Sequence, residues 1–323
     1  MLAVILLCVA ANATIGAAPT KSKQRRGELA QGTAPLTAWW GDQDTIVRKA
    51  DSLTTGVEPA MSPDGRRVAF IRNGTSLWLC DLQSSKATQL RRCENAHSPS
   101  WDPTGRQIAF TGNPGSWDAT GENFLPSEKI GILDSYGIWI IQADGGRLRE
   151  LPGGSSEDQY PLWSPDGRWI AWTRGKQIWL TDTSGVEQHP LTAAPASQFE
   201  FPLSWSPDGV ELLYAAWENP VTPEYELRLI RRDGTDQRRD SMSILSEFPQ
   251  GVCWSPDGKF LLQAQWSAVS LIERRAGRRS RTLMLTPGSP AVGKMAISRD
   301  QSVIVYEDGD PEADELLSII RLH

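Results

Sequence analysis

The sequence has few of the residues that usually carry chemistry. It contains three histidines, at positions 97, 189 and 323, and no two of them have the spacing of paired metal ligands. It has no G-x-S-x-G segment, the signature of a nucleophile elbow. The Gly-rich segments at 112–121 and 152–158 do not match a phosphate-binding loop. These absences argue against a histidine metal centre, an α/β-hydrolase site and a P-loop nucleotide site.

Charge and cysteine content set two further limits. The formal net charge is -6, which argues against nucleic acid as a general partner. Four cysteines in 323 residues are too few for a disulfide scaffold. Cys80 and Cys93 flank one predicted hairpin, but its turn places Cys80 nearer Thr88. A bridge between them is left open by the sequence.

One long apolar run is present, and it lies at the N-terminus. Leu2 to Ala11 is almost unbroken, and the small residues that follow suit a signal peptidase. We therefore expect a signal peptide at 1–18, a polar linker at 19–38, and a periplasmic or secreted location. A membrane anchor is the alternative, in which case the chain would contact the membrane through an uncleaved N-terminus.

The dominant feature of the sequence is a repeated turn, written Trp-Ser-Pro-Asp-Gly in its full form. Six full or relaxed copies begin at positions 61, 101, 163, 205, 254 and 297. The steps between them are 40, 62, 42, 49 and 43 residues. Pro presets one corner of such a turn, Asp bonds the backbone two residues on, and Gly accepts a positive φ. A period near 40 residues is typical of a propeller blade.

Short alternating strands surround each turn. One strand follows the turn, as at 67–71 and 169–173, and a third strand comes next, as at 77–82 and 178–183. The sequence therefore predicts an all-β fold, a six-bladed β-propeller of four-stranded blades over residues 39–323. We expect an N-terminal strand at 45–48 to close the ring by completing the last blade, which would remove a free sheet edge.

Tryptophans recur at two positions of the repeat. The recurring residues are Trp101, Trp163, Trp205 and Trp254 before the turns and Trp78, Trp139 and Trp179 on the third strands. A residue that returns in every blade serves the packing of blades, because a binding site needs residues that differ from one blade to the next. We therefore assign these seven tryptophans to the core.

The repeat carries a resemblance to a known family. The segment PLWSPDGRWIAWTRGKQIWLTDTSGVEQHPLT at 161–192 resembles the repeat of the TolB-type, WD40-like (PD40) propellers. The resemblance covers about residues 45–323 and implies a six-bladed propeller of an exported bacterial protein. TolB itself works in the Tol–Pal system of the cell envelope, where it binds a peptidoglycan-associated lipoprotein. The resemblance extends to the propeller of TolB and not to the α/β domain that precedes this propeller. It also implies relation to the gating propellers of prolyl-oligopeptidase-like enzymes.

Blade topology assigns the loops to two ends of the ring. We call the end that carries the loops between strands 2 and 3, and the loops that lead into each blade, the loop face. The opposite end, with the Ser-Pro-Asp-Gly turns and the turns between strands 3 and 4, is the turn face. Acidic residues gather on the loop face, as at 307–315, and arginines on the turn face, as at 231–239 and 274–281. This pattern indicates either a partner of complementary charge or solvated turns.

The candidate ligand-binding residues lie where the chain enters the inner strands from the loop face. They are His97, Asp158, Gln159, Tyr160, Phe199, Glu200, Phe201 and Gln250. Aromatic rings beside carboxylates could hold a peptide or a sugar in the mouth of the ring. A second candidate is the run Asp308, Asp310, Glu312 and Asp314, whose alternating carboxylates could converge on Ca²⁺.

Two functions of different classes follow. The first is an exported, non-enzymatic propeller that binds an envelope protein or peptide as a monomer, with no catalytic residues, no nucleic acid partner and no cofactor apart from a possible Ca²⁺. The second is a lyase or hydrolase acting on a polysaccharide or oligosaccharide, or a sugar-binding propeller, on the acidic loop face. Asp158 and Glu200 would then supply general acid–base catalysis.

Overall fold

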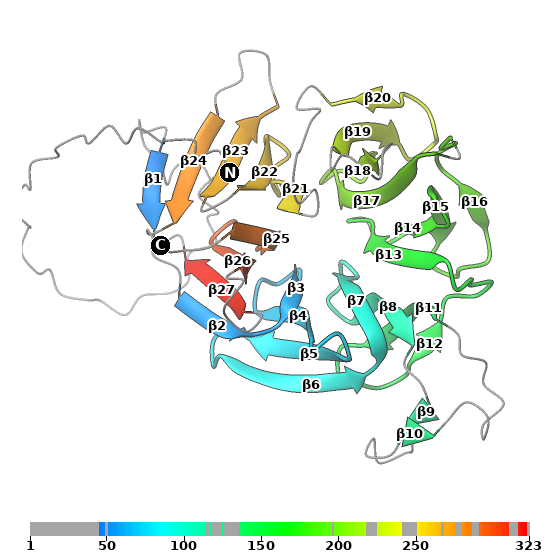
Figure 1. The fold of residues 1–323 in the computed structure, drawn as a ribbon, viewed down its shortest axis with the longest axis horizontal. Coiled ribbons are helices and arrows are strands. Elements are labelled where there is room, and N and C mark those ends of the chain that lie inside the picture. Colours follow the sequence, from blue (N-terminus) through cyan, green and yellow to red (C-terminus); the bar gives the residue numbers. More distant parts are fainter. Residues whose placement is uncertain are drawn as a thin grey trace, which may run out of the picture. The chain divides into compact units, whose positions relative to one another are not determined.

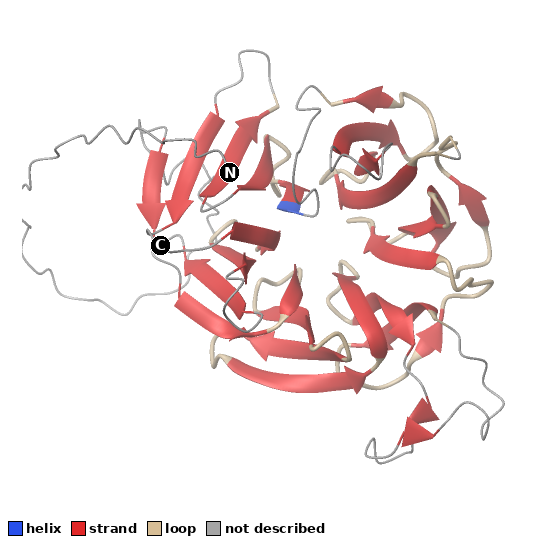
Figure 2. Ribbon diagram, in the orientation of Figure 1, coloured by secondary structure: helices blue, strands red, loops and turns tan. Residues whose placement is uncertain are grey.

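Six sheets stand around a common axis in the computed structural model (Figure 1). The structure describes residues 45–48, 51–113, 116–117, 124–125, 136–195, 197–217, 225–240, 251–265, 268–274, 280–285, 291–309 and 316–321. Strands make up nearly all of this ring (Figure 2), and its residues belong to one compact unit, Thr33–His323. The predicted all-β, six-bladed propeller is confirmed.

The first three blades follow the chain in order from the axis outward. Blade 1 consists of β3 (Val57–Met61), β4 (Arg67–Arg72), β5 (Ser76–Asp81) and β6 (Lys86–Arg92). Blade 2 consists of β7 (Glu94–Trp101), β8 (Gln107–Asn113), β11 (Gly137–Gln142) and β12 (Arg149–Glu150). Blade 3 consists of β13 (Asp158–Trp163), β14 (Trp169–Arg174), β15 (Gln177–Asp182) and β16 (Gln188–Pro190). The long step at blade 2 contains a small hairpin of β9 (Ser116–Trp117) and β10 (Phe124–Leu125).

The last three blades repeat this order. Blade 4 consists of β17 (Phe199–Trp205), β18 (Glu211–Trp217), β19 (Tyr225–Arg231) and β20 (Arg238–Arg239). Blade 5 consists of β21 (Val252–Trp254), β22 (Phe260–Gln265), β23 (Ala268–Glu273) and β24 (Ser280–Leu285). Blade 6 takes β25 (Ala291–Ile297), β26 (Val303–Gly309) and β27 (Leu316–Arg321) from the end of the chain.

The ring is closed by an N-terminal strand, but by a later one than the sequence predicted. β2 (Asp51–Thr55) pairs antiparallel with β27 and completes blade 6. Its Leu53 packs against the buried cluster between blades 6 and 1, which includes Phe70 and Leu317. The expected closing strand, β1 (Thr45–Arg48), pairs instead in parallel with β24, as a fifth strand of blade 5.

The repeated turn owes its shape to its own serine and aspartate. In blade 3 the Ser164 hydroxyl donates to Asp166 at 2.6 Å and accepts the Trp169 N–H at 3.0 Å. Gly167 has a φ of 72°, which a side chain would strain. In the relaxed copy at blade 2, Asp102 replaces the serine and accepts the backbone N–H groups that follow, including that of Gln107 at 2.7 Å. In both sequences, therefore, the side chain that follows the Trp position accepts the backbone N–H group five residues later.

The tryptophans before the turns pack between neighbouring blades, as predicted. Trp101, Trp163 and Trp205 are buried. The Trp101 indole N–H donates to the Ala60 carbonyl of blade 1 at 3.0 Å. The Trp205 indole N–H reaches the Leu162 carbonyl of blade 3 at 3.3 Å. Each of these two indoles thus joins its blade to the preceding one.

The structure also bears on the Cys80–Cys93 bridge and on the positive charge of the turn face. Cys80 and Cys93 are separate buried thiols, so they form no disulfide with each other. In the arginine clusters at 231–239 and 274, each described arginine is paired with a carboxylate, for example Arg232 with Asp166 at 2.9 Å and Arg239 with Glu226 at 2.8 Å. Much of the positive charge that the sequence placed on this face is therefore neutralised locally. Within the described ranges, no helix is long and apolar enough to span a membrane.

Candidate functional site

The inner strands share an irregularity at one repeated position. The pairing register shifts there in β3, β7, β13, β17 and β25, which is the mark of a β-bulge. Three of the bulged residues, Glu58, Ser98 and Tyr160, have φ between 53° and 59°. Each stands three residues before the Trp position of its turn, and Lys294 occupies the same position in blade 6. The bulges therefore bring four unlike side chains to one level of the axis.

The backbone N–H groups of these bulges bind side chains of the preceding blade. The Glu58 N–H donates to Glu307 of blade 6, and the Ser98 N–H donates to Glu58 of blade 1. The Tyr160 N–H donates to the Thr111 hydroxyl of blade 2 at 3.1 Å. Glu307 and Thr111 are equivalent residues of the second strand in their blades. The sequence placed Glu307 in an acidic loop, whereas the structure places it in β26.

A small charged network results where blade 6 meets blade 1. The Lys294 ammonium lies 3.5 Å from the Glu58 carboxylate, and the Lys294 N–H donates to Glu307 at 3.1 Å. Burial opposes ionisation of Glu58, yet Lys294, His97 and the Ser98 N–H together hold its pKa below the usual value. Burial raises the pKa of Glu307. Glu58 is therefore the ionised partner of Lys294.

His97, one of the predicted ligand-binding residues, lies next to this charged network. Its Nε2 lies 2.5 Å from the Tyr136 hydroxyl, and its Nδ1 lies 3.2 Å from the Ser98 hydroxyl. Burial lowers the pKa of His97 to about 4, against the pull of Glu58, and the imidazole is neutral near pH 7. Burial likewise raises the pKa of Tyr136 to about 12.

The predicted aromatic residues are brought together on the loop-face side of the axis. The Tyr160 ring lies 5.3 Å from His97 and 5.6 Å from Phe201 between centroids. Phe201 in turn lies 6.1 Å from both Phe199 and Tyr225. Such separations are typical of packed aromatic pairs, so much of the surface of each ring is in contact with other rings of the cluster.

The two predicted acids, Asp158 and Glu200, are both buried, each with an arginine nearby. Asp158 is fully buried and receives Arg174 at 2.7 and 2.8 Å. Glu200 is also fully buried, its Oε1 lies 3.9 Å from Arg228, and burial raises its pKa. Asp158 therefore has a hydrogen-bonded partner, whereas the buried oxygens of Glu200 make no hydrogen bond to Arg228. Gln159 is half-buried on β13, and Gln250 lies outside the described residues.

The predicted calcium ligands fall largely outside the described residues. Asp310, Glu312 and Asp314 are not among them. Asp308 lies on β26 and accepts the Ser318 hydroxyl at 3.0 Å. In the part of the chain that is described, no group of three or more His, Cys, Asp or Glu side chains could hold a metal ion.

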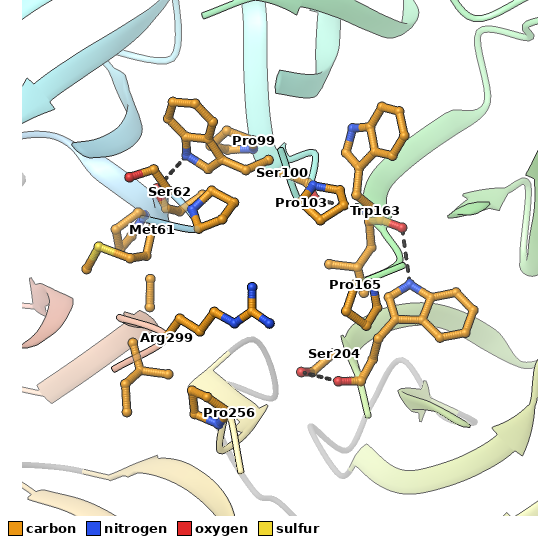
Figure 3. Close-up of a pocket in the computed structure, with 18 of the residues that line it drawn as sticks. Met61, Ser62, Pro99, Ser100, Pro103, Trp163, Pro165, Ser204, Pro256 and Arg299 are labelled. Atoms are coloured by element: carbon orange, nitrogen blue, oxygen red, sulfur yellow. Dashed lines mark hydrogen bonds between the residues drawn. The ribbon is translucent and has the colours of Figure 1, made fainter. Parts of the chain in front are cut away.

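A cavity of about 410 Å³ lies on the axis at the turn face (Figure 3). Its wall combines proline rings, tryptophan edges and small apolar side chains such as Ala60, Leu203 and Ala296. Three tryptophans therefore pack between neighbouring blades and also present a ring edge to the cavity: Trp101, Trp163 and Trp205. A narrower pocket of about 60 Å³ shares Pro99, Leu162, Leu203 and Lys294 with it and continues toward Tyr160 and Phe201.

The prolines of the repeated turns form the rim of the cavity in five blades. They are Pro63, Pro103, Pro165, Pro207 and Pro256. In blade 6 the turn reads Ile-Ser-Arg-Asp-Gln, and Arg299 stands at the proline position. Figure 3 shows its guanidinium extending over the cavity, opposite Pro165. Arg299 and Lys294 are the charged residues among those lining the cavity, and both are cationic.

This cavity is the part of the site that the sequence did not indicate. Proline in a tight turn has a sufficient local explanation, and so the turns were assigned to structure alone. The available signal was the departure from the motif at Arg299, the one copy of the repeat with a charged residue in place of proline.

Comparisons with known proteins agree on the propeller. No family model matches the chain. YuxL of Bacillus subtilis, an uncharacterized peptidase, is 28% identical over 190 residues, covering 53% of this chain and 25% of that protein. The Tol-Pal system protein TolB of Anaeromyxobacter dehalogenans is 28% identical over 126 residues, covering 38% of this chain and 24% of TolB. The chain thus spans about a quarter of the length of these curated relatives.

Solved structures give the same fold at low identity. A gluconolactonase of Xanthomonas campestris superposes with a TM-score of 0.57 at 15% identity, over 85% of this chain and 88% of that one. TolB of Acinetobacter baumannii superposes with a TM-score of 0.52 at 16% identity, over 80% of this chain and 62% of TolB. Six blades, the repeated turn and the TolB relatives together identify the described part of this chain as a TolB-like β-propeller.

Proposed function

We propose that this chain is an exported, non-enzymatic propeller that binds a protein or peptide segment in the cell envelope, and that the axial cavity at the turn face is where the segment binds. The cavity is the observation that carries the proposal. Its volume of about 410 Å³ falls in the range of ligand sites. The N-terminal apolar run and the TolB relatives support export.

The lining favours a peptide over a sugar. Proline, tryptophan and aliphatic side chains dominate it, which suits apolar side chains of a protein segment. A sugar needs many polar partners for its hydroxyls. The Ser62 and Ser164 hydroxyls donate to the aspartates of their own turns at 2.6 Å, and the Ser204 hydroxyl donates to a backbone carbonyl at 3.4 Å. These lining hydroxyls are already used by the chain.

The enzymatic alternative has weaker support. It relies on Asp158 and Glu200 as an acid–base pair on the loop face. Asp158 receives two hydrogen bonds from Arg174, and Glu200 lies near Arg228. A general acid or base has to reach the substrate, and burial behind an arginine works against that.

A peptide-retention experiment tests the proposal. A library of synthetic peptides is passed over immobilised wild-type protein and over Ala296→Phe, which fills the cavity wall with a ring. Retained peptides are identified by mass spectrometry. We expect a defined set on the wild type that is lost on Ala296→Phe. Retention of the same set by both proteins would place binding elsewhere, and turnover in a polysaccharide-cleavage screen would favour the enzyme.

A further inference from the structure

Arg299 is the unusual member of the cavity rim. The same turn position carries proline in the other five blades, so the fold does not require a cation there. In five blades the aspartate after this position accepts a hydrogen bond from the serine of its own turn. For example, Asp257 accepts the Ser255 hydroxyl at 2.6 Å, and Asp300 accepts the Ser298 hydroxyl at 2.5 Å.

The two cations of the cavity have different surroundings. Lys294 is 3.5 Å from the ionised Glu58 at the narrow end of the cavity, so its charge is largely compensated. Arg299 is exposed at the rim, and no described carboxylate lies within ion-pairing distance of it. The cavity therefore combines an apolar wall with one guanidinium that pairs with no carboxylate of the described residues. An anionic group that enters beside apolar side chains would meet a planar fork suited to a carboxylate.

The shape of the axis indicates which carboxylate fits. Beyond Lys294 the space narrows from the cavity of about 410 Å³ to a pocket of about 60 Å³. For a polypeptide that enters from the turn face, the described residues leave less space beyond Lys294 than in the cavity itself. An internal acidic residue would need space for chain on both sides of it, whereas a chain end needs space on one side.

We propose that the cavity binds the free C-terminus of a partner polypeptide, with its last side chains against the proline and tryptophan wall and its α-carboxylate on Arg299. This inference rests on the proposed function and narrows it to one ligand chemistry. No bond is made or broken in the process. Arg299 acts as the residue that distinguishes a free carboxylate from an amide.

Paired peptides test the inference. N-terminally fluorescein-labelled heptapeptides ending in Ala-Pro-Phe or Ala-Pro-Leu are made as free acids and as C-terminal amides. Their affinities are measured by fluorescence anisotropy with wild-type protein, Arg299→Gln, Arg299→Pro and Arg168→Gln. Arg299→Pro restores the residue found in the other blades, and Arg168→Gln removes an exposed cation of the same face that does not line the cavity. Thermal melting confirms that each variant is folded.

We expect the free acid to bind the wild type about tenfold more tightly than the amide, the size of one charge-assisted hydrogen-bonded contact. Arg299→Gln and Arg299→Pro should bind acid and amide equally, at the affinity of the amide, while Arg168→Gln keeps the wild-type preference. Equal affinity of both forms for the wild type would overturn the inference and leave peptide binding intact. If neither these peptides nor any peptide of the library binds, the proposed function and the inference both fail.

Discussion

The Lys294 ammonium lies 3.5 Å from the Glu58 carboxylate, and the pair joins the last blade of the ring to the first. The same carboxylate accepts the Ser98 N–H of blade 2. Glu58 therefore ties three blades together at the level of the β-bulges. Glu58 lines neither the cavity nor the narrower pocket, so it bears on stability more than on ligand contact.

Loss of the Glu58 charge should weaken the closure of the ring. We expect Glu58→Gln to lower the free energy of unfolding by about 1–3 kcal/mol, because Lys294 and the Ser98 N–H lose a charged acceptor in a half-buried site. Urea denaturation measures the loss, and a double-mutant cycle with Lys294→Met isolates the pair. Lys259→Met, which removes an exposed partner of Asp257, should change stability by less than about 0.5 kcal/mol. A coupling energy near zero would show that the Lys294–Glu58 pair does not stabilise the ring.

His97 should make the protein sensitive to mild acid. Its pKa of about 4 in the folded state lies below the unfolded value near 6.5, so the unfolded chain binds the proton more readily. The stability from this group is fully present above about pH 6.5 and falls as the pH drops toward 4, by at most about 3 kcal/mol. Glu58, Lys294, Tyr136 and Tyr160 are the titratable neighbours that surround it.

The comparison with His97→Gln isolates this contribution. Free energies of unfolding are measured between pH 7 and pH 5, above the range in which the lowered pKa of Glu58 adds its own loss. Protonation of Glu307, whose pKa is raised, favours the folded state as the pH falls, and it acts in both proteins. The variant should show a shallower decline than the wild type. Parallel curves would mean that His97 does not titrate in this range.

Asp158 separates the two functional hypotheses through its effect on stability. In this account it is a buried partner of Arg174, so Asp158→Asn should cost about 3 kcal/mol of folding free energy. Asp236→Asn is the matched control, since Asp236 pairs with Arg238 in an exposed position and should cost less than about 1 kcal/mol. Both values come from chemical denaturation. Unchanged stability of Asp158→Asn, together with loss of a polysaccharide-cleaving activity, would assign Asp158 to catalysis instead.

The blade count could be predicted from the sequence because a local signal repeats in every blade. Ser, Pro, Asp and Gly each have a local reason to occupy their turn positions, as the bonds of Ser164 and Asp166 show. Ring closure depends on a distant contact. Both 45–48 and 51–55 form strands, and the packing of Leu53 against blades 6 and 1 accompanies the pairing of the second one with blade 6.

The candidate site was predictable in part for a similar reason. The approach of His97, Tyr160 and Phe201 followed from their places three or four residues before the Trp position in successive blades, and the structure brings these rings together. The cavity at the turn face depends on how six turns meet at the axis, which no single repeat specifies. Arg299 could be singled out once its departure from the motif was set against the position of the five prolines.

The most direct test of the account is the affinity of one free-acid peptide for two matched variants. Ala296→Phe fills the axial cavity, and Glu157→Phe adds the same ring to an exposed position on the loop face. Fluorescence anisotropy with the labelled heptapeptide ending in Ala-Pro-Phe should show at least a tenfold loss of affinity for Ala296→Phe and wild-type affinity for Glu157→Phe. Wild-type affinity of Ala296→Phe, with loss of binding by Glu157→Phe, would contradict the account and place the ligand on the loop face.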